Sequence, residues 1–153
     1  MRVLELKVPP LILVGVFAAA MYGVSILIPS ARFPTPAWPL AAVAVASTGG
    51  LIALAGVLRF RASKTTVNPL TPAASTMLVC SGVYRYSRNP MYLGFLLCLI
   101  GWALHLSNSL STLLLPLFVA YMNRFQIEPE ERALYAKFGP SFTEYTRTVR
   151  RWI

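Results

Sequence analysis

Three long stretches without a charged residue dominate the chain, at 8–31, 33–58 and 89–123. A helix that crosses a hydrocarbon core about 30 Å thick needs about 20 such residues. A soluble domain would instead alternate apolar and polar positions. The pattern therefore predicts membrane-spanning helices over roughly 8–28 and 40–58.

The third stretch is too long for one span. As a single helix, residues 89–123 would measure about 52 Å at about 1.5 Å per residue. The sequence "HLSNS" at 105–109 is polar enough to break it, which predicts a helical hairpin. We therefore expect an all-α integral membrane bundle of about four transmembrane helices. Both termini and the segment 59–88 then lie on the cytoplasmic side, in the inner (plasma) membrane if the host is a bacterium.

Composition supports a membrane protein with one domain. The 153 residues are 56% hydrophobic and 12% charged, and the mean hydropathy is +0.61. These values are typical of integral membrane proteins. We expect a single domain over 1–153, with two spans in 1–58 and the remaining elements in 59–153.

The excess of basic residues, 14 Lys and Arg against five Asp and Glu, raises the alternative of a nucleic-acid partner. Its distribution argues against that alternative, because loops poor and rich in cations alternate as the positive-inside rule requires. No basic patch is interleaved with aromatic residues in the way that binding to bases favours. We therefore expect membrane lipids and no nucleic acid as partners.

Small residues recur at helical spacing in the second and third predicted spans. Such faces allow close packing of helices, and they also permit pairing into a homo-oligomer. A tunnel for a substrate is the alternative for the face in the third span. The two faces are formed by Gly49, Ala53 and Gly56, and by Gly94, Cys98, Gly101 and His105.

The chain changes character after Arg124 and becomes amphipathic. Pro129 is placed to open a helix, with Glu130 and Glu131 in the first turn. The pair at 139–140, Gly-Pro, should end that helix and start another. We expect this helical tail to rest at the cytoplasmic interface. Its aromatic residues should pack it against the bundle; they are Tyr135, Phe138, Phe142 and Tyr145.

Few residues can carry chemistry, because the chain has one His and no Asp. Hydrolytic triads, metal clusters and phosphate-binding loops are therefore poorly supplied, and we expect no metal. Three unusual features remain: the segment "GVYRYSRNPMYLG" at 82–94, Arg124, and "EPEE" at 128–131. If the third and fourth spans form a hairpin, all three meet at one membrane face, where they would suit a zwitterionic, nucleotide-like ligand. The alternative is that the cations mark the membrane boundary while Pro90 and the glutamates begin helices.

The segment "GVYRYSRNPMYLG" resembles the G-x-Y-x-x-x-R-H/N-P-x-Y-x-G signature of the isoprenylcysteine carboxyl methyltransferase and phospholipid methyltransferase families. The ending "EERALYAKFGPSFTEYTRTVRRWI" is similar to their E-E-x-x-L…F-G-x-x-Y-x-x-Y pattern. The stretch "TTVNPLTP" looks like the one that precedes the signature in bacterial members. The match covers roughly 59–153, and the first two spans match in hydropathy alone.

The resemblance implies a membrane methyltransferase that uses S-adenosylmethionine and releases S-adenosylhomocysteine. Its acceptor would be a lipophilic small molecule, or a prenyl or lipid substrate, that enters from the bilayer. Arg124 would orient a carboxylate acceptor, whereas Glu128 or a water bound to a tyrosine would be the base for an amine or thiol. Asn89 stands where the isoprenylcysteine enzymes have His. The residues carried over to the cofactor are Tyr84, Arg88, Asn89, Pro90, Tyr92, Leu93, Gly94, Glu130 and Glu131.

Two other functions remain open. One is a membrane lipid reductase of the sterol-reductase type that uses NAD(P)H, whose fold looks related but whose larger phosphorylated cofactor needs more room. The other is a non-enzymatic membrane protein that binds lipid. A pure scaffold should tolerate Gln in place of the two glutamates.

Overall fold

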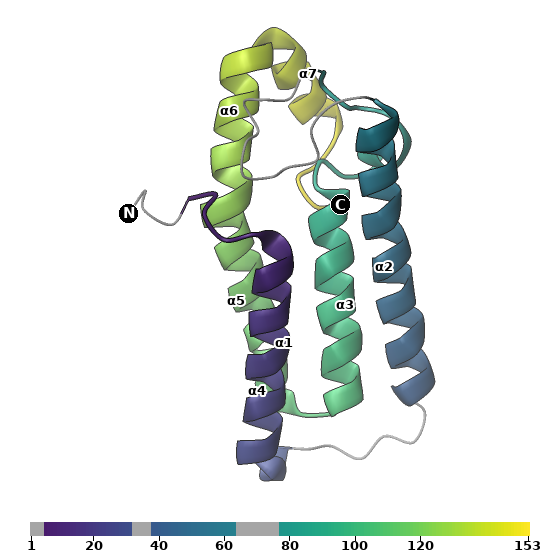
Figure 1. Cartoon of the computed structure of the whole chain (residues 1–153), viewed down its shortest axis with the longest axis vertical. Helices are drawn as coiled ribbons and strands as arrows, with labels where there is room; N and C mark the ends of the chain where they lie inside the picture. Colours follow the sequence, from purple (N-terminus) through teal and green to yellow (C-terminus); the bar gives the residue numbers. More distant parts are fainter. Residues whose placement is uncertain (1–4, 32–37, 64–76) are drawn as a thin grey trace.

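The computed structural model describes residues 5–31, 38–63 and 77–153, and within these ranges it is all-helical (Figure 1). The predicted stretch "TTVNPLTP" lies outside the described residues. Short 3₁₀ turns occur at Pro29–Ala31 and Gly82–Arg85, and a π-helix at Met122–Ile127. The α-helices are α1 (Pro10–Leu27), α2 (Trp38–Ala62), α3 (Pro90–Leu106), α4 (Ser109–Thr112), α5 (Leu114–Tyr121), α6 (Glu128–Phe138) and α7 (Pro140–Thr148).

Two of these helices are long and apolar enough to cross a membrane, namely α1 and the part of α2 from Pro39 to Ala62. Their outer faces are strongly apolar and open; for example, Leu27 is 81% exposed and Leu40 80%. Such exposure is expected where lipid tails cover the side chains. The first two predicted spans are therefore confirmed as helices that are long and apolar enough to cross a membrane. A crossing by α3 and by α4–α5 stays a prediction, because α3 has 17 residues.

The predicted break between the third and fourth spans is confirmed. Ser107 follows α3 with a left-handed φ of 50°, and the Asn108 side chain then caps α4 by accepting from the Ser111 amide at 3.0 Å. Asn108 Nδ2 also donates to the Ile28 carbonyl at 2.9 Å, and Ser111 Oγ donates to the Met21 carbonyl at 2.8 Å. The turn between α3 and α4 is thus fixed by side-chain hydrogen bonds to the backbone at the end of α1.

The two predicted faces of small residues meet each other, which brings α2 and α3 into close backbone contact. A methyl group added at Gly49 would lie 2.5 Å from the Gly94 carbonyl oxygen, and one at Gly101 would lie 2.7 Å from the Ala42 carbonyl oxygen. Cys98 Sγ lies 3.5 Å from the Ala46 carbonyl on the same contact. The prediction of close helix packing is therefore confirmed for this pair of helices.

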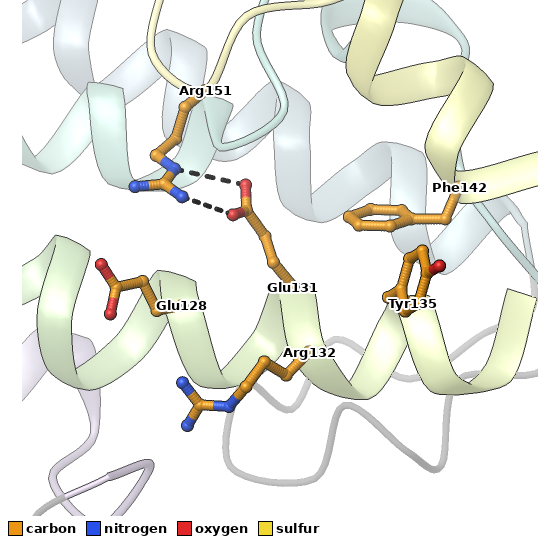
Figure 2. Close-up of a pocket in the computed structure, with 6 residues that line it drawn as sticks. All are labelled: Glu128, Glu131, Arg132, Tyr135, Phe142 and Arg151. Carbon is orange, nitrogen blue, oxygen red and sulfur yellow. Dashed lines mark hydrogen bonds and ion pairs between the residues drawn. The ribbon is translucent and has the colours of Figure 1, made fainter. Parts of the chain in front are cut away.

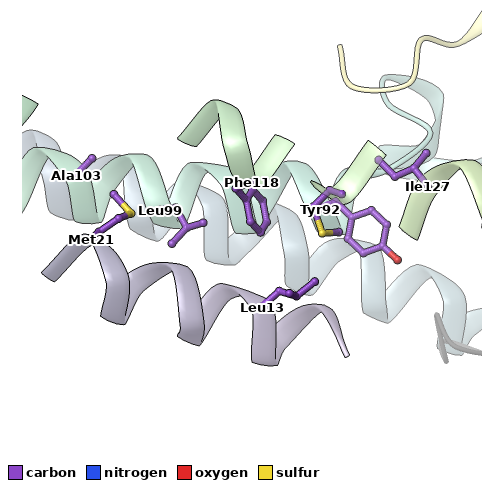
Figure 3. Packing of buried hydrophobic residues seen from close by; sticks show 8 residues of the cluster. Leu13, Met21, Tyr92, Leu99, Ala103, Phe118 and Ile127 are labelled. Atoms are coloured by element: carbon purple, nitrogen blue, oxygen red, sulfur yellow. The ribbon is translucent and has the colours of Figure 1, made fainter. Parts of the chain in front are cut away.

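The apolar core lies on the opposite side of α3, between α3, α1 and α5 (Figures 1 and 3). Leu99 of α3 and Met21 of α1 are almost fully buried there, as is Phe118 of α5. The Phe118 ring meets the Phe17 ring edge-on, with centroids 5.3 Å apart. The centre of the molecule is therefore α3, which has backbone contact on one side and side-chain packing on the other.

The helix that begins with α5 continues through the π-helix into α6. Pro129 has no amide to donate to the carbonyl of Phe125 four residues earlier. The Leu6 amide donates to that carbonyl instead, at 3.0 Å, and Gln126 Nε2 donates to the Val8 carbonyl at 2.7 Å. The segment that precedes α1 is therefore fixed on the π-helix.

The tail forms two helices with the predicted boundaries. Three glutamates and Pro129 lie in the first turn of α6, and Gly139, with φ 47°, separates α6 from α7. Phe142 and Tyr145 are buried as expected. Tyr135, however, is 60% exposed, so the prediction that it packs against the bundle is wrong. A place at the cytoplasmic interface stays a prediction.

Candidate functional site

Three side chains from distant parts of the chain form an ion-pair cluster, which we call the Arg88–Glu131–Arg151 tie. Arg88 precedes α3, Glu131 lies in α6, and Arg151 follows α7. The Glu131 carboxylate accepts from Arg88 Nη2 at 2.8 Å and from Arg151 Nη2 at 2.6 Å. The Arg88 and Glu131 side chains are only 14% and 19% exposed, so solvent screens this tie less than an ordinary surface pair.

The end of the chain also binds the signature segment through its backbone. The Arg88 amide donates to the Arg150 carbonyl at 3.0 Å, and Asn89 Nδ2 donates to the Arg151 carbonyl at 3.0 Å. Arg88 Nη1 donates to the carbonyl of Val149 at 2.9 Å. The fold therefore assembles the segment that begins α3 together with α6 and the chain end.

Arg151 is a site residue that reasoning from the sequence missed. It belongs to the basic pair "RR" in the ending "TVRRWI", which looks like a membrane-boundary signal. The one hint in the sequence was the excess of cations, 14 Lys and Arg against five Asp and Glu in the whole chain, which makes an arginine partner for Glu131 common by number but does not say which one it is. Only the turn of the chain after α7 shows that this cation reaches Glu131.

A group of polar side chains lies beside the tie. The Tyr92 hydroxyl donates a short hydrogen bond to the Glu130 carboxyl group. Burial raises the pKa of Glu130 to about 8; the hydrogen bond from Tyr92 opposes this rise, and the charge of Glu131 adds to it. The Tyr84 hydroxyl is buried nearby and has no hydrogen-bond partner among the described residues. Glu130 is thus an acid that can hold or release a proton close to neutral pH.

A pocket of about 490 Å³ opens next to the Arg88–Glu131–Arg151 tie (Figure 2). Its floor is one face of α6, since four lining residues follow the helical spacing i, i+3, i+4 and i+7. The rings of Tyr135 and Phe142 form one wall, and the Glu131–Arg151 ion pair forms another. The lining residues are Glu128, Glu131, Arg132, Tyr135, Phe142 and Arg151.

The two residues predicted to act on the acceptor lie close together at one edge of this region. Glu128 lines the pocket, and its Oε2 lies 3.6 Å from Arg124 Nη1. Arg124 is not among the lining residues; it binds Glu5, at 3.2 Å. Arg132, which does line the pocket, binds the other oxygen of Glu5 at 2.5 Å.

The family model for phospholipid methyltransferases matches residues 38–141, which include the signature segment, the acidic cluster and α6. The chain belongs to this family. Over 73 residues it is 37% identical to the protein-S-isoprenylcysteine O-methyltransferase of Schizosaccharomyces pombe, and over 76 residues it is 40% identical to that of Saccharomyces cerevisiae. Each alignment covers 48% of this chain, which spans about a third of each enzyme's length (31% and 30%).

A further relative is an uncharacterized protein of Haemophilus influenzae. It is 46% identical over 63 residues, which are 41% of this chain and 100% of that protein. No solved structure matches the chain. The comparisons thus establish a family of membrane methyltransferases.

In this phospholipid methyltransferase family member, the remaining predicted residues divide into three groups. Tyr84 and Tyr92 belong to the buried group around Glu130, whereas Gly94 lies in the α2–α3 contact. Pro90 is buried at the first position of α3, and the Leu93 amide continues the helix by donating to the Asn89 carbonyl at 2.9 Å. None of these lines the pocket. Their contacts with a cofactor stay predictions.

Proposed function

We propose that this protein transfers a methyl group from S-adenosylmethionine to a lipophilic acceptor at the cytoplasmic face of the membrane. The acceptor is of the isoprenylcysteine or lipid type and enters from the bilayer. The observation that carries the proposal is the Arg88–Glu131–Arg151 tie, which joins both family motifs at a pocket of about 490 Å³. Pockets for small molecules and cofactors measure about 300–1,000 Å³.

The pocket residues fit a ligand that carries a flat ring and a positive charge. Tyr135 and Phe142 offer ring faces against which an adenine can stack. The Glu128 side chain is 41% exposed, and among the described residues its one ion pair is with Arg124 at 3.6 Å, so its oxygens can accept from an ammonium group or a ribose hydroxyl. Glu131, already bound by two arginines, holds Arg151 in the wall.

When bound, S-adenosylmethionine supplies a methyl group on a sulfonium, which a nucleophile can take by direct displacement. The protein's contribution is then mainly to align the acceptor and to exclude water. An ionised carboxylate needs no base, and Arg124 would orient it by a charge-assisted hydrogen bond. For an amine or a thiol, Glu128 would accept the proton.

The test is the melting temperature of the detergent-purified chain with S-adenosylhomocysteine, with NADPH, and with neither. A ligand at 100 times its dissociation constant stabilises the folded state by about 2.7 kcal/mol. We expect S-adenosylhomocysteine alone to raise the melting temperature, and Glu131→Gln to lose this shift. Glu144→Gln is the matched control, because Glu144 pairs with Arg147 on the surface of α7 at 3.7 Å, outside the pocket.

The other outcomes each favour a different function. A rise with NADPH alone would replace the proposal by a lipid reductase. No shift with either ligand, or an unchanged shift in Glu131→Gln, would contradict the proposed site and favour a protein that binds lipid without catalysis.

A further inference from the structure

Two arginines hold one carboxylate at the edge of the pocket. Arg124 Nη1 lies 3.2 Å from Glu5 Oε1, and Arg132 Nη2 lies 2.5 Å from Glu5 Oε2. Each arginine therefore binds a different oxygen of the same group. Two guanidinium groups around one anionic group form an arrangement that suits a carboxylate or a phosphate.

The carboxylate in this arrangement comes from the segment before α1, more than a hundred residues away in sequence. Glu5 is only 13% exposed, whereas the side chains of Arg124 and Arg132 are 44% and 55% exposed. An anion from outside can therefore approach the two cations although Glu5 is covered. Arg132 also lines the pocket, so an anion bound to it would lie at the pocket edge.

The segment does not depend on the Glu5 carboxylate for its position. The Leu6 amide is bound to the Phe125 carbonyl at 3.0 Å, and the Val8 carbonyl to Gln126 Nε2 at 2.7 Å. A rotation of the Glu5 side chain could therefore free both arginines while the backbone stays in place. If the Glu5 carboxylate served only to anchor the segment, it would repeat what these two hydrogen bonds already do.

We propose that Arg124 and Arg132 form a binding site for the anionic group of the incoming acceptor, and that Glu5 occupies this site until the acceptor displaces it. The identity of the ligand as an acceptor rests on the proposed function. The ligand chemistry is an amphiphile that ends in a carboxylate or a phosphate. Glu128 is the other carboxylate beside Arg124, at 3.6 Å, and it disfavours a second anion on its own side.

The experiment measures binding of three amphiphiles to the full detergent-purified chain without any cofactor. The probes are N-acetyl-S-farnesylcysteine, its uncharged primary amide, and dodecyl phosphate. In Glu5→Gln we expect both anionic probes to bind about tenfold more tightly, which corresponds to about 1.4 kcal/mol, while the amide is unchanged. In Arg132→Gln both anions should bind about tenfold more weakly, again without an effect on the amide.

The exposed pair on α7 supplies matched controls, because Glu144→Gln and Arg147→Gln make the same charge changes away from the pocket. Neither control should alter binding of any probe. A carboxylate preference would indicate an acceptor of the prenylcysteine type, and a phosphate preference would indicate a lipid headgroup. Either preference supports the site.

Two results would overturn the proposal. One is an unchanged affinity for both anions in Glu5→Gln, which would make the contact an anchor only. The other is an equal loss of anion and amide binding in Arg132→Gln. If Glu5→Gln does not fold, Arg132→Gln and Arg132→Lys decide the matter, since Lys keeps the charge and should retain part of the affinity. Absence of a shift with S-adenosylhomocysteine would contradict the methyltransferase proposal but leave this binding result intact.

Discussion

The α2–α3 contact and the Arg88–Glu131–Arg151 tie hold the molecule together by opposite means. Along α2 and α3, glycines allow the backbones to touch, and the fit depends on the lack of a side chain at these positions. At the tie, long charged side chains bridge three separate segments, and the fit depends on complementary charge. The first region should therefore be sensitive to added volume, and the second to lost charge.

The largest effect should come from adding one methyl group to the α2–α3 contact. In Gly49→Ala the new carbon would lie 2.5 Å from the Gly94 carbonyl oxygen and 2.8 Å from the Cys98 amide nitrogen, and neither backbone atom can move cheaply. We expect a loss of about 3 kcal/mol in the free energy of unfolding, at the upper end of what overpacking costs. Thermal unfolding in detergent measures it.

The adjacent residue provides the control, because a methyl group at Gly50 meets nothing within 4 Å. Gly50→Ala should match or exceed the wild-type stability, since Ala favours a helix over Gly by up to about 1 kcal/mol. Equal losses in the two variants would show that the contact does not depend on volume.

A smaller loss should follow from removing the charge at the centre of the tie. Glu131→Gln leaves Arg88 largely covered and without its carboxylate, and breaking a buried pair costs about 3–5 kcal/mol. Since both partners keep some exposure, we expect about 2 kcal/mol, measured by the same unfolding experiment. The exposed pair of Glu144 and Arg147 should contribute less than about 1 kcal/mol, so Glu144→Gln should unfold like the wild type. If Glu131→Gln also unfolds like the wild type, the tie contributes no more to the free energy of unfolding than an exposed surface pair does.

The third effect is a pH dependence, which we expect only in the polar group around Glu130, beside the tie. The pKa of Glu130 is about 8 in the folded chain against an ordinary 4.5. Between these values the folded state keeps a proton that the unfolded state has lost. The stabilisation is therefore complete below about pH 4.5 and is lost as the pH rises through about 8.

The measurement is the unfolding midpoint of the wild type and of Glu130→Gln from pH 5 to pH 9. Their difference isolates Glu130 from other titrating groups, and the wild type should lose stability with rising pH relative to the variant. Gly50→Ala should keep the full wild-type slope. Parallel curves for the wild type and Glu130→Gln would mean that Glu130 is not held as an acid.

The parts of the fold that the sequence predicted well are local. The spacing of Gly49 and Ala53, and of Gly94 and Gly101, identified two faces that meet in the structure, because helical geometry alone puts such residues on one side. The boundary at Gly139 was equally predictable, since glycine and proline constrain the backbone at their own positions.

The parts that could not be predicted depend on how the chain returns on itself. Glu131 could be identified as unusual, yet its partner Arg151 lies beyond the turn between α6 and α7, whose direction no local pattern specifies. The same holds for Glu5, which no spacing connects to Arg132. The error at Tyr135 has this origin too: its aromatic ring predicts burial, but the side chain borders the pocket.

The segment formed by α4, α5, the π-helix and α6 runs in one direction along the molecule, with Leu113 as a turn residue between α4 and α5 (Figure 1). From Ser109 to Phe138 it measures about 45 Å at about 1.5 Å per residue, whereas the hydrocarbon core is about 30 Å thick. If the Ser109 end lies at one surface of the core, Glu128 falls about 29 Å away, at the other surface. If the proposed function holds, an acceptor tethered by its lipid chain could then present its head to the pocket without leaving the bilayer, and the combined length of these elements would set which part of the acceptor reaches the pocket.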